Sequence, residues 1–198
     1  MARIITISRE FGSGGRELGK RLSEALGIPC YDHQIIEMVA KEYGFDQNYV
    51  AHMSENDLRA AYPSTIARGF VAPNYALQQS VQIAAAQHKL IRSLAEKGDC
   101  VIVGRCADYV LKDLHNVAHV FLYASEEKRI ERIMRVENVD RSAARDLIRK
   151  TDKQRKSYYN FFADGNWGLR SNYDLMLRTD DHTPEEVADT IIAFARKG

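Results

Sequence analysis

The chain lacks the features that mark membrane, secreted and zinc-binding proteins. No apolar run in its 198 residues approaches membrane-spanning length, and the first residues lack the charged and apolar regions of a signal peptide. It has only three cysteines, an odd number for disulfide pairing, and no two of them have the C-x-x-C spacing of a zinc site. We therefore expect a cytoplasmic protein with reduced thiols and no membrane partner.

An excess of charge of one sign is also absent. The sequence has 28 Lys and Arg residues against 27 Asp and Glu residues, so its formal net charge at pH 7 is only +1. A near-neutral chain gives no global argument for nucleic-acid binding, and any basic site must be local. Internal repeats and low-complexity segments are missing too. With 45% hydrophobic and 28% charged residues, the composition is that of an ordinary globular protein, long enough for one sizeable domain.

A glycine cluster near the N-terminus separates a strand pattern from a helix pattern. Residues 4–7 have the β-branched character of a strand buried on both faces, and apolar residues recur at helical spacing over 18–26. The cluster between them consists of Gly12, Ser13, Gly14 and Gly15. Glycines let backbone N–H groups turn toward one centre, beside the positive end of the following helix. The stretch predicts a phosphate-binding loop or, in the alternative without a ligand, a glycine-rich turn that caps the helix.

The phosphate-loop pattern G-x-x-x-x-G-K-[ST] can be drawn on the sequence in two registers. The literal match runs from Gly14 to Gly19 and Lys20. We reject it, because it places Lys20 well inside the helical run and leaves too few residues for a helix before Gly27. The other register fits the strand-to-helix junction but departs from the pattern at three positions.

In the second register, Arg16 stands where the lysine belongs and Glu17 where the hydroxyl belongs. Gly15 is then the last glycine, and Glu10 takes the position of the first. Arg16 can bind phosphate oxygens through two parallel hydrogen bonds and stays charged, so it can do the binding work of the lysine. Glu17 is expected either to ligate Mg²⁺ or to sit favourably in the first turn of the helix.

Two further residues are candidates for ligand contacts. Asp32 ends a very short strand and precedes a helical pattern over residues 33–40, so we expect it either to cap that helix or to contact a substrate. Arg105 follows Gly104 at the end of an apolar strand over residues 99–103. Because ligands of open parallel sheets bind at the carboxyl ends of the strands, we expect Arg105 to contact an anion.

Residues 149–156 are densely basic, and five aromatic residues follow within residues 158–167. Such a stretch can bind nucleic acid by stacking. We favour a lid whose cations close over phosphates, and we expect no nucleic-acid partner. Residues 44–75 show no sustained period and could hold either a substrate-covering segment or an oligomer contact, so the oligomeric state stays open.

Strand and helix patterns alternate along the rest of the chain. A helical pattern covers residues 77–97, strands are expected at 119–124 and 173–177, and Ser125 and Thr183 are expected to cap the helices that follow these strands. This order predicts a three-layer α/β/α domain with about five parallel strands and the phosphate loop after the first strand.

Five motifs in the chain resemble those of the cytidylate kinase-like family, within the P-loop superfamily. They begin at Ile7, Tyr31, Val103, Asp152 and Asn172 and read ISREFGSGGRELG, YD, VGRCADY, DKQR and NYD. The motifs span nearly the whole chain. The resemblance implies a P-loop nucleoside monophosphate kinase fold, the use of ATP and Mg²⁺, and a small phosphorylated acceptor such as CMP or dCMP.

The same resemblance assigns roles to positions in this chain. Residues 12–17 would cradle the ATP phosphates, and Asp32 falls at the aspartate that opens the acceptor-binding segment. Arg105 falls at an arginine that contacts the acceptor phosphate. Lys153 and Arg155 fall in the lid, where such cations stabilise the transferring phosphoryl group. Arg16, the cation expected in the loop, would act with them.

The expected organisation is a single kinase-like domain. Its core would comprise residues 1–32, 98–140 and 171–198, with a helical acceptor-binding segment at 33–97 and a short lid region at 141–170. The expected function is ATP-dependent phosphoryl transfer. The alternative is a catalytically weak or inactive nucleotide-binding regulatory protein, which the missing lysine and hydroxyl of the phosphate motif favour. The metal ligands are left open.

Overall fold

The computed structural model describes residues 4–44, 46–48, 50, 75–163 and 165–197. Five parallel strands form its central sheet, in the order β2-β3-β1-β4-β5. The strands are β1 (Ile4–Arg9), β2 (Cys30–Tyr31), β3 (Cys100–Val103), β4 (Val117–Tyr123) and β5 (Leu175–Arg178). The predicted five-stranded parallel sheet is confirmed.

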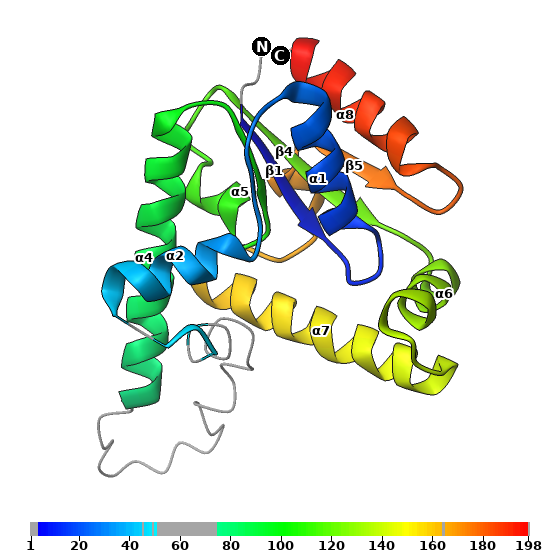
Figure 1. Ribbon diagram of the computed structural model, residues 1–198, viewed down its shortest axis with the longest axis horizontal. Helices are drawn as coiled ribbons and strands as arrows, with labels where there is room; N and C mark the ends of the chain where they lie inside the picture. Colours follow the sequence, from blue (N-terminus) through cyan, green and yellow to red (C-terminus); the bar gives the residue numbers. More distant parts are fainter. Residues whose placement is uncertain (1–3, 45, 49, 51–74, 164, 198) are drawn as a thin grey trace.

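Helices cover both faces of this sheet (Figure 1). On one face lie α1 (Gly15–Leu26) and α8 (Pro184–Lys197), and on the other lie α2 (Gln34–Tyr43), α4 (Tyr75–Lys97) and α5 (Ala107–Val110). The predicted three-layer α/β/α architecture is therefore confirmed.

The central strand β1 supplies side chains to both layers of the core. Ile4 belongs to the core cluster beneath α2 and α4, whereas Ile5 and Ile7 belong to the cluster beneath α1 and α8. Successive side chains of a strand point to opposite faces of the sheet. Residues 4–7 are β-branched throughout, as suits a strand covered by helices on both faces, and this is why the strand could be predicted from the sequence.

The strand register brings several loops to one edge of the sheet. Ile7 pairs with Val103 of β3 and with Val120 of β4, so the chain leaves these neighbouring strands at a common carboxyl edge. After β4 come α6 (Glu126–Glu137) and α7 (Arg141–Phe162), and a short 3-10 helix, η2 (Arg170–Asn172), precedes β5. Helix α7 runs along the edge where β1 ends (Figure 1).

Two predicted helix caps are confirmed. The Ser125 hydroxyl accepts a hydrogen bond from the Lys128 N–H at the start of α6. At the start of α8, the Glu186 N–H donates to the Thr183 hydroxyl at 3.2 Å, and the Thr183 N–H donates to the Glu186 carboxylate at 2.8 Å. The second arrangement is a capping box, which satisfies two backbone donors reciprocally.

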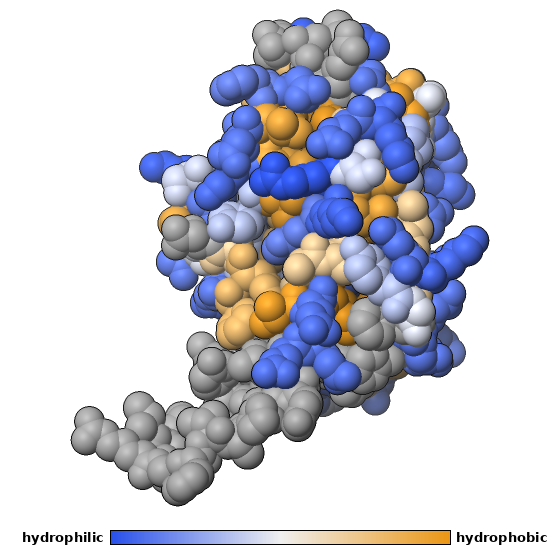
Figure 2. All heavy atoms as spheres, turned by 90° about the vertical axis from the view of Figure 1, so that its left-hand side faces the viewer, coloured by the Kyte–Doolittle hydropathy of each residue, from blue (hydrophilic) through white to orange (hydrophobic). Residues whose placement is uncertain are grey.

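The side of the molecule formed by α2 and α4 carries polar side chains with apolar groups between them (Figure 2). None of the helices in the described part of the chain is both long and apolar enough to cross a membrane.

Most of residues 44–75, predicted to cover a substrate or to form an oligomer contact, lie outside the described residues. The division into core, acceptor-binding segment and lid stays a prediction.

A substitution at Gly19 would test how closely α1 packs on the sheet. A Cβ at this position would lie 2.6 Å from Val103 Cγ2 and 3.2 Å from Cys30 Sγ. We expect Gly19→Ala to lower the free energy of unfolding by about 1–3 kcal/mol, because the added methyl group overpacks the interface although alanine favours helices. Denaturant unfolding followed by circular dichroism measures this effect.

The matched control is Glu24→Ala on the exposed side of the same helix, which should change the free energy of unfolding by no more than about 0.5 kcal/mol. A Gly19→Ala protein as stable as the wild type would contradict the close packing of α1 against β3.

Candidate functional site

Two glycines in the left-handed conformation shape the loop between β1 and α1. Gly12 has a φ of 87° and Gly14 a φ of 90°. Gly14 is the N-cap of α1, whose first residue is Gly15. The first N–H groups of a helix have no partner within the helix and form the positive end of its dipole. The loop therefore has the geometry of an anion site. The literal match of the phosphate-loop pattern, from Gly14 to Gly19 and Lys20, is excluded because Gly19 lies inside α1.

A cavity of about 700 Å³ lies beside this loop, bordered by the end of β3 and by α6 and α7. Its volume suits a small organic ligand. Six cationic side chains line it against four carboxylates: Arg9, Arg16, Lys20, Arg105, Arg132 and Arg155 against Glu10, Glu17, Asp32 and Glu137. Of the ten predicted site residues, eight line this cavity.

The two others, Ser13 and Lys153, are not among the lining residues. Ser13 is buried, its hydroxyl donates to the Glu10 carbonyl at 2.9 Å, and its own carbonyl accepts from the Thr179 hydroxyl at 3.0 Å. It therefore holds the shape of the loop. Lys153 is exposed on α7, and the lid role of this residue stays a prediction.

Asp32 connects two arginines at the carboxyl edge of the sheet. The Arg16 Nε donates to Asp32 Oδ2 at 2.8 Å, and the Arg9 Nη2 lies 3.5 Å from Asp32 Oδ1. The N-cap of α2 is His33, which makes no side-chain capping bond. Of the two roles left open for Asp32, helix capping is therefore wrong, because its carboxylate is engaged by arginines. The substrate contact stays a prediction.

Arg9 is a candidate that sequence reasoning missed. It is the last residue of β1, but its side chain borders the cavity and is 17% exposed. Burial lowers its pKa to about 9, helped by the charges of Arg155, Arg105 and Arg16 and opposed by Asp32. The signal available in the sequence was a charged residue at the end of an otherwise uncharged strand.

Helix α7 holds the loop from the opposite side. The Phe11 N–H donates to Asp152 Oδ1 at 2.7 Å, and the Arg129 Nη1 donates to the other oxygen of the same carboxylate at 2.5 Å. The Arg155 Nη1 donates to the Arg9 carbonyl at 2.9 Å, and the Arg155 guanidinium lies 5.4 Å from the centre of the Phe11 ring. The predicted lid region therefore contacts the glycine loop directly. Asp152 was not predicted as a site residue.

The carboxylates next to the loop are paired with arginines, which limits how they can hold a metal. Glu17 pairs with Arg132 of α6, and Glu10 Oε2 lies 3.6 Å from Arg129 Nε. Within the described residues, no group of three or more His, Cys, Asp or Glu side chains is arranged to hold a metal ion. Mg²⁺ commonly takes only one or two carboxylates, with substrate phosphates and water as its other ligands. If a Mg²⁺ ion arrived with a bound nucleotide, Glu10 and Glu17 are the carboxylates beside the loop that would be available to it.

The turn after β3 is strained in a way that aims Arg105. Gly104, Arg105 and Cys106 have φ values of 78°, 57° and 54°, respectively. A left-handed conformation is uncommon for residues other than glycine, and such strain concentrates at functional sites. The predicted anion contact of Arg105 agrees with its place on the cavity wall.

A buried carboxylate lies directly behind the cavity wall. The Ser8 hydroxyl donates to Asp108 Oδ1 at 3.1 Å, and the Tyr159 hydroxyl donates to Asp108 Oδ2 at 2.7 Å. The Asn172 amide in turn donates to the Tyr159 oxygen at 3.3 Å. Burial raises the pKa of Asp108. The network joins β1, α5, α7 and η2, and sequence reasoning did not single it out.

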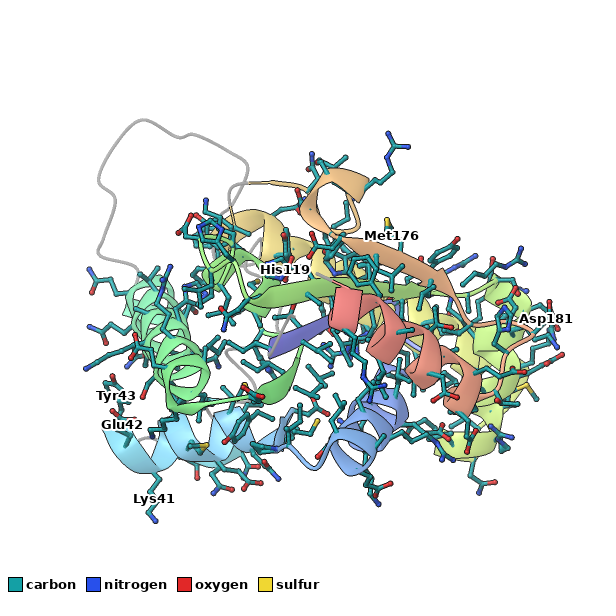
Figure 3. All side chains as sticks on the ribbon, turned by 90° about the horizontal axis from the view of Figure 1, so that it is seen from above. Lys41, Glu42, Tyr43, His119, Met176 and Asp181 are labelled. Carbon is teal, nitrogen blue, oxygen red and sulfur yellow. The ribbon has the colours of Figure 1, made fainter. Side chains whose placement is uncertain are left out.

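His119 is half-buried on β4 and is not among the residues that line the cavity. It lies on β4, whereas Lys41, Glu42 and Tyr43 lie at the outer end of α2 (Figure 3). The His119 Nδ1 is 2.9 Å from the Thr6 hydroxyl oxygen, and burial lowers the pKa of His119. This histidine therefore has a structural part in joining β1 and β4.

Sequence comparisons place known kinases among the relatives of this chain. The model of the cytidylate kinase-like family matches residues 4–181. A cytidylate kinase from Methanopyrus kandleri is 28% identical over 193 residues, which cover 92% of this chain and 88% of the relative. One from Thermoplasma acidophilum is 32% identical over 100 residues, covering 49% of this chain and 53% of the relative.

A uronate isomerase from Corynebacterium glutamicum is 30% identical over 98 residues, which cover 49% of this chain but only 19% of that protein. The chain thus matches about half of the Thermoplasma relative and about a fifth of the isomerase.

Solved structures agree on the fold. An uncharacterized protein from Eubacterium ventriosum is 30% identical, with a TM-score of 0.76 and coverage of 98% of this chain and 99% of that chain. A shikimate kinase from Bacteroides thetaiotaomicron is 12% identical, with a TM-score of 0.56 and coverage of 98% of both chains. At that identity, the shikimate kinase shows the fold alone, which is the α/β fold of P-loop kinases.

The buried carboxylate makes a prediction about pH. A group whose pKa is raised by folding contributes stability below its ordinary pKa, and this contribution is lost as the pH rises through the folded-state pKa. The stability advantage of the wild type over Asp108→Asn should therefore be full at and below about pH 4 and should shrink toward neutral pH. Denaturant unfolding of both proteins at a series of pH values measures this difference. A difference that stays constant or grows with pH would contradict a buried carboxylate with a raised pKa.

Proposed function

The chain belongs to the cytidylate kinase-like family, and we propose that it transfers the terminal phosphoryl group of ATP to a nucleoside monophosphate such as CMP or dCMP, or to a related small phosphorylated acceptor. The observation that carries the proposal is the cavity in which the glycine loop meets arginines from β1, α1, α6, α7 and the turn after β3. Phosphoryl transfer needs positioning and neutralisation of charge more than it needs covalent chemistry from the protein.

The donor phosphates are assigned to the loop. Residues 12–17 offer the backbone N–H groups at the start of α1, beside the cationic side chain of Arg16. Arg155 already contacts the loop from α7, and we assign it to the negative charge on the transferring group. Lys153, on the same helix, is retained as a second lid cation. Mg²⁺ bound with ATP would neutralise charge on the donor phosphates.

The acceptor is assigned to Asp32 and Arg105. Arg105 sits in the strained turn after β3 and can bind the acceptor phosphate through two parallel hydrogen bonds. Asp32 stands at the start of the segment that leads into α2, where it is tied to the loop through Arg16. A phosphate acceptor is already ionised near neutral pH, so the transfer does not depend on a general base.

The proposal predicts that Arg155 matters for turnover. Arg155→Ala should lower kcat/KM for the best acceptor by about 10²-fold, because a charge that stabilises the transferring group is lost. A coupled assay for ADP release, run with MgATP and each nucleoside monophosphate, measures this effect. Arg149→Ala is the matched control, since Arg149 is exposed on the same helix and outside the cavity wall, and it should stay near wild type.

The same assay decides between the proposal and the regulatory alternative. A folded wild-type protein that binds ATP but transfers phosphate to no nucleoside monophosphate or common phosphorylated metabolite would contradict kinase activity. That result would support the nucleotide-binding regulatory protein instead.

A further inference from the structure

Arg9 occupies the space in front of the first residue of α1. A Cβ built on Gly15 would lie 2.7 Å from Arg9 Cγ and 3.1 Å from Arg9 Cβ. Gly15 is not among the glycines with a positive φ, so its backbone conformation would accept a side chain. The space already filled by Arg9, and not the conformation, is what requires glycine at this position.

The start of the helix determines how the phosphate-loop pattern lies on this chain. In that pattern, the lysine follows the last glycine, where the loop enters the helix. Gly14 is the N-cap of α1, so Gly15 stands at the lysine position and Arg9 at the position of the first glycine. The cation and a glycine have therefore changed places between the two ends of the loop.

A second glycine leaves room for the guanidinium group of Arg9. A Cβ on Gly104 would lie 1.9 Å from Arg9 Nη1. The Arg9 side chain therefore runs from the end of β1 past Gly15 and Gly104 and borders the cavity. Glycines at both places allow one side chain to reach the phosphate loop from an unusual direction.

The charges around Arg9 favour a bound anion. The positive charges of Arg155, Arg105 and Arg16 repel this buried guanidinium and lower its pKa. The Asp32 carboxylate favours the charged form of Arg9, and the distance from Arg9 Nη2 to Asp32 Oδ1 is 3.5 Å. Phosphate oxygens at this point would reduce the repulsion and match the two-pronged geometry of a guanidinium group.

We infer that Arg9 supplies the phosphate-binding cation that P-loop proteins take from the lysine of the loop, whereas Arg16 is held by Asp32. This inference rests on the proposed function and deepens it. It moves the lysine's role from Arg16, where the sequence pattern placed it, to the residue that ends β1.

The inference can be tested by moving the cation back to its usual position. Arg9→Gly should weaken ATP binding about 10- to 100-fold, because a charged hydrogen-bond donor is lost. Gly15→Lys alone should also weaken it, because the new side chain meets Arg9. The double variant Arg9→Gly/Gly15→Lys restores the pattern G-x-x-x-x-G-K and should bind ATP more tightly than either single variant. Titration calorimetry with MgATP and no acceptor measures binding without turnover.

Three results would overturn the inference. Arg9→Gly could bind ATP as tightly as the wild type, Gly15→Lys could be equally harmful with and without Arg9, or Arg16→Ala could weaken binding more than Arg9→Gly. If circular dichroism shows that Arg9→Gly is unfolded, Arg9→Lys and Arg9→Met replace it, because they differ in charge at similar length. Binding by Arg9→Lys but not by Arg9→Met supports the inference, and equal binding by both overturns it.

The wild-type protein separates this inference from the proposed function. If the wild type binds no MgATP, the proposed function fails, and the inference fails with it. If the wild type binds MgATP and transfers phosphate while Arg9→Gly behaves like it, only the inference fails.

Discussion

Repulsion between arginine side chains is the constraint around which the carboxyl edge of the sheet is arranged. Arg16, Arg105 and Arg155 all disfavour the charge of Arg9, and the burial of Arg9 makes that charge more costly than it would be on an open surface. Carboxylates offset positive charge at this edge and beside the loop: Asp32 binds Arg16, Asp152 binds Arg129, and Glu17 binds Arg132. The cavity keeps more cations than carboxylates, and this excess is what suits it to phosphate.

Much of the fold could be predicted because its signals are local. Residues 4–7 are β-branched throughout, as suits a strand covered on both faces, and Ser125 and Thr183 cap helices through residues only a few positions away. The glycine loop was visible for the same reason, since strand, glycines and helix follow one another directly. The family resemblance placed Arg105 and Arg155, and the structure brings both to the wall of one cavity.

The rest of the site depends on contacts between distant parts of the chain. Asp152 binds the Phe11 N–H across 141 positions, and Asp108 binds Ser8 across 100, so no local pattern could reveal either. Asp32 looked equally suited to capping a helix and to contacting a ligand, until the structure showed the arginines on its carboxylate. Arg9 could be read as the polar end of a strand, and only the space in front of Gly15 shows where its side chain goes.

The central claim is that phosphates bind at the glycine loop against a cation that comes from the end of β1. A crystal structure with Mg²⁺ and a non-hydrolysable ATP analogue tests it most directly. The account predicts the analogue's phosphates over the N–H groups at the start of α1, with the Arg9 guanidinium within hydrogen-bonding distance of a phosphate oxygen. Phosphates bound away from this loop, or bound by Arg16 while Arg9 stays on Asp32, would contradict it.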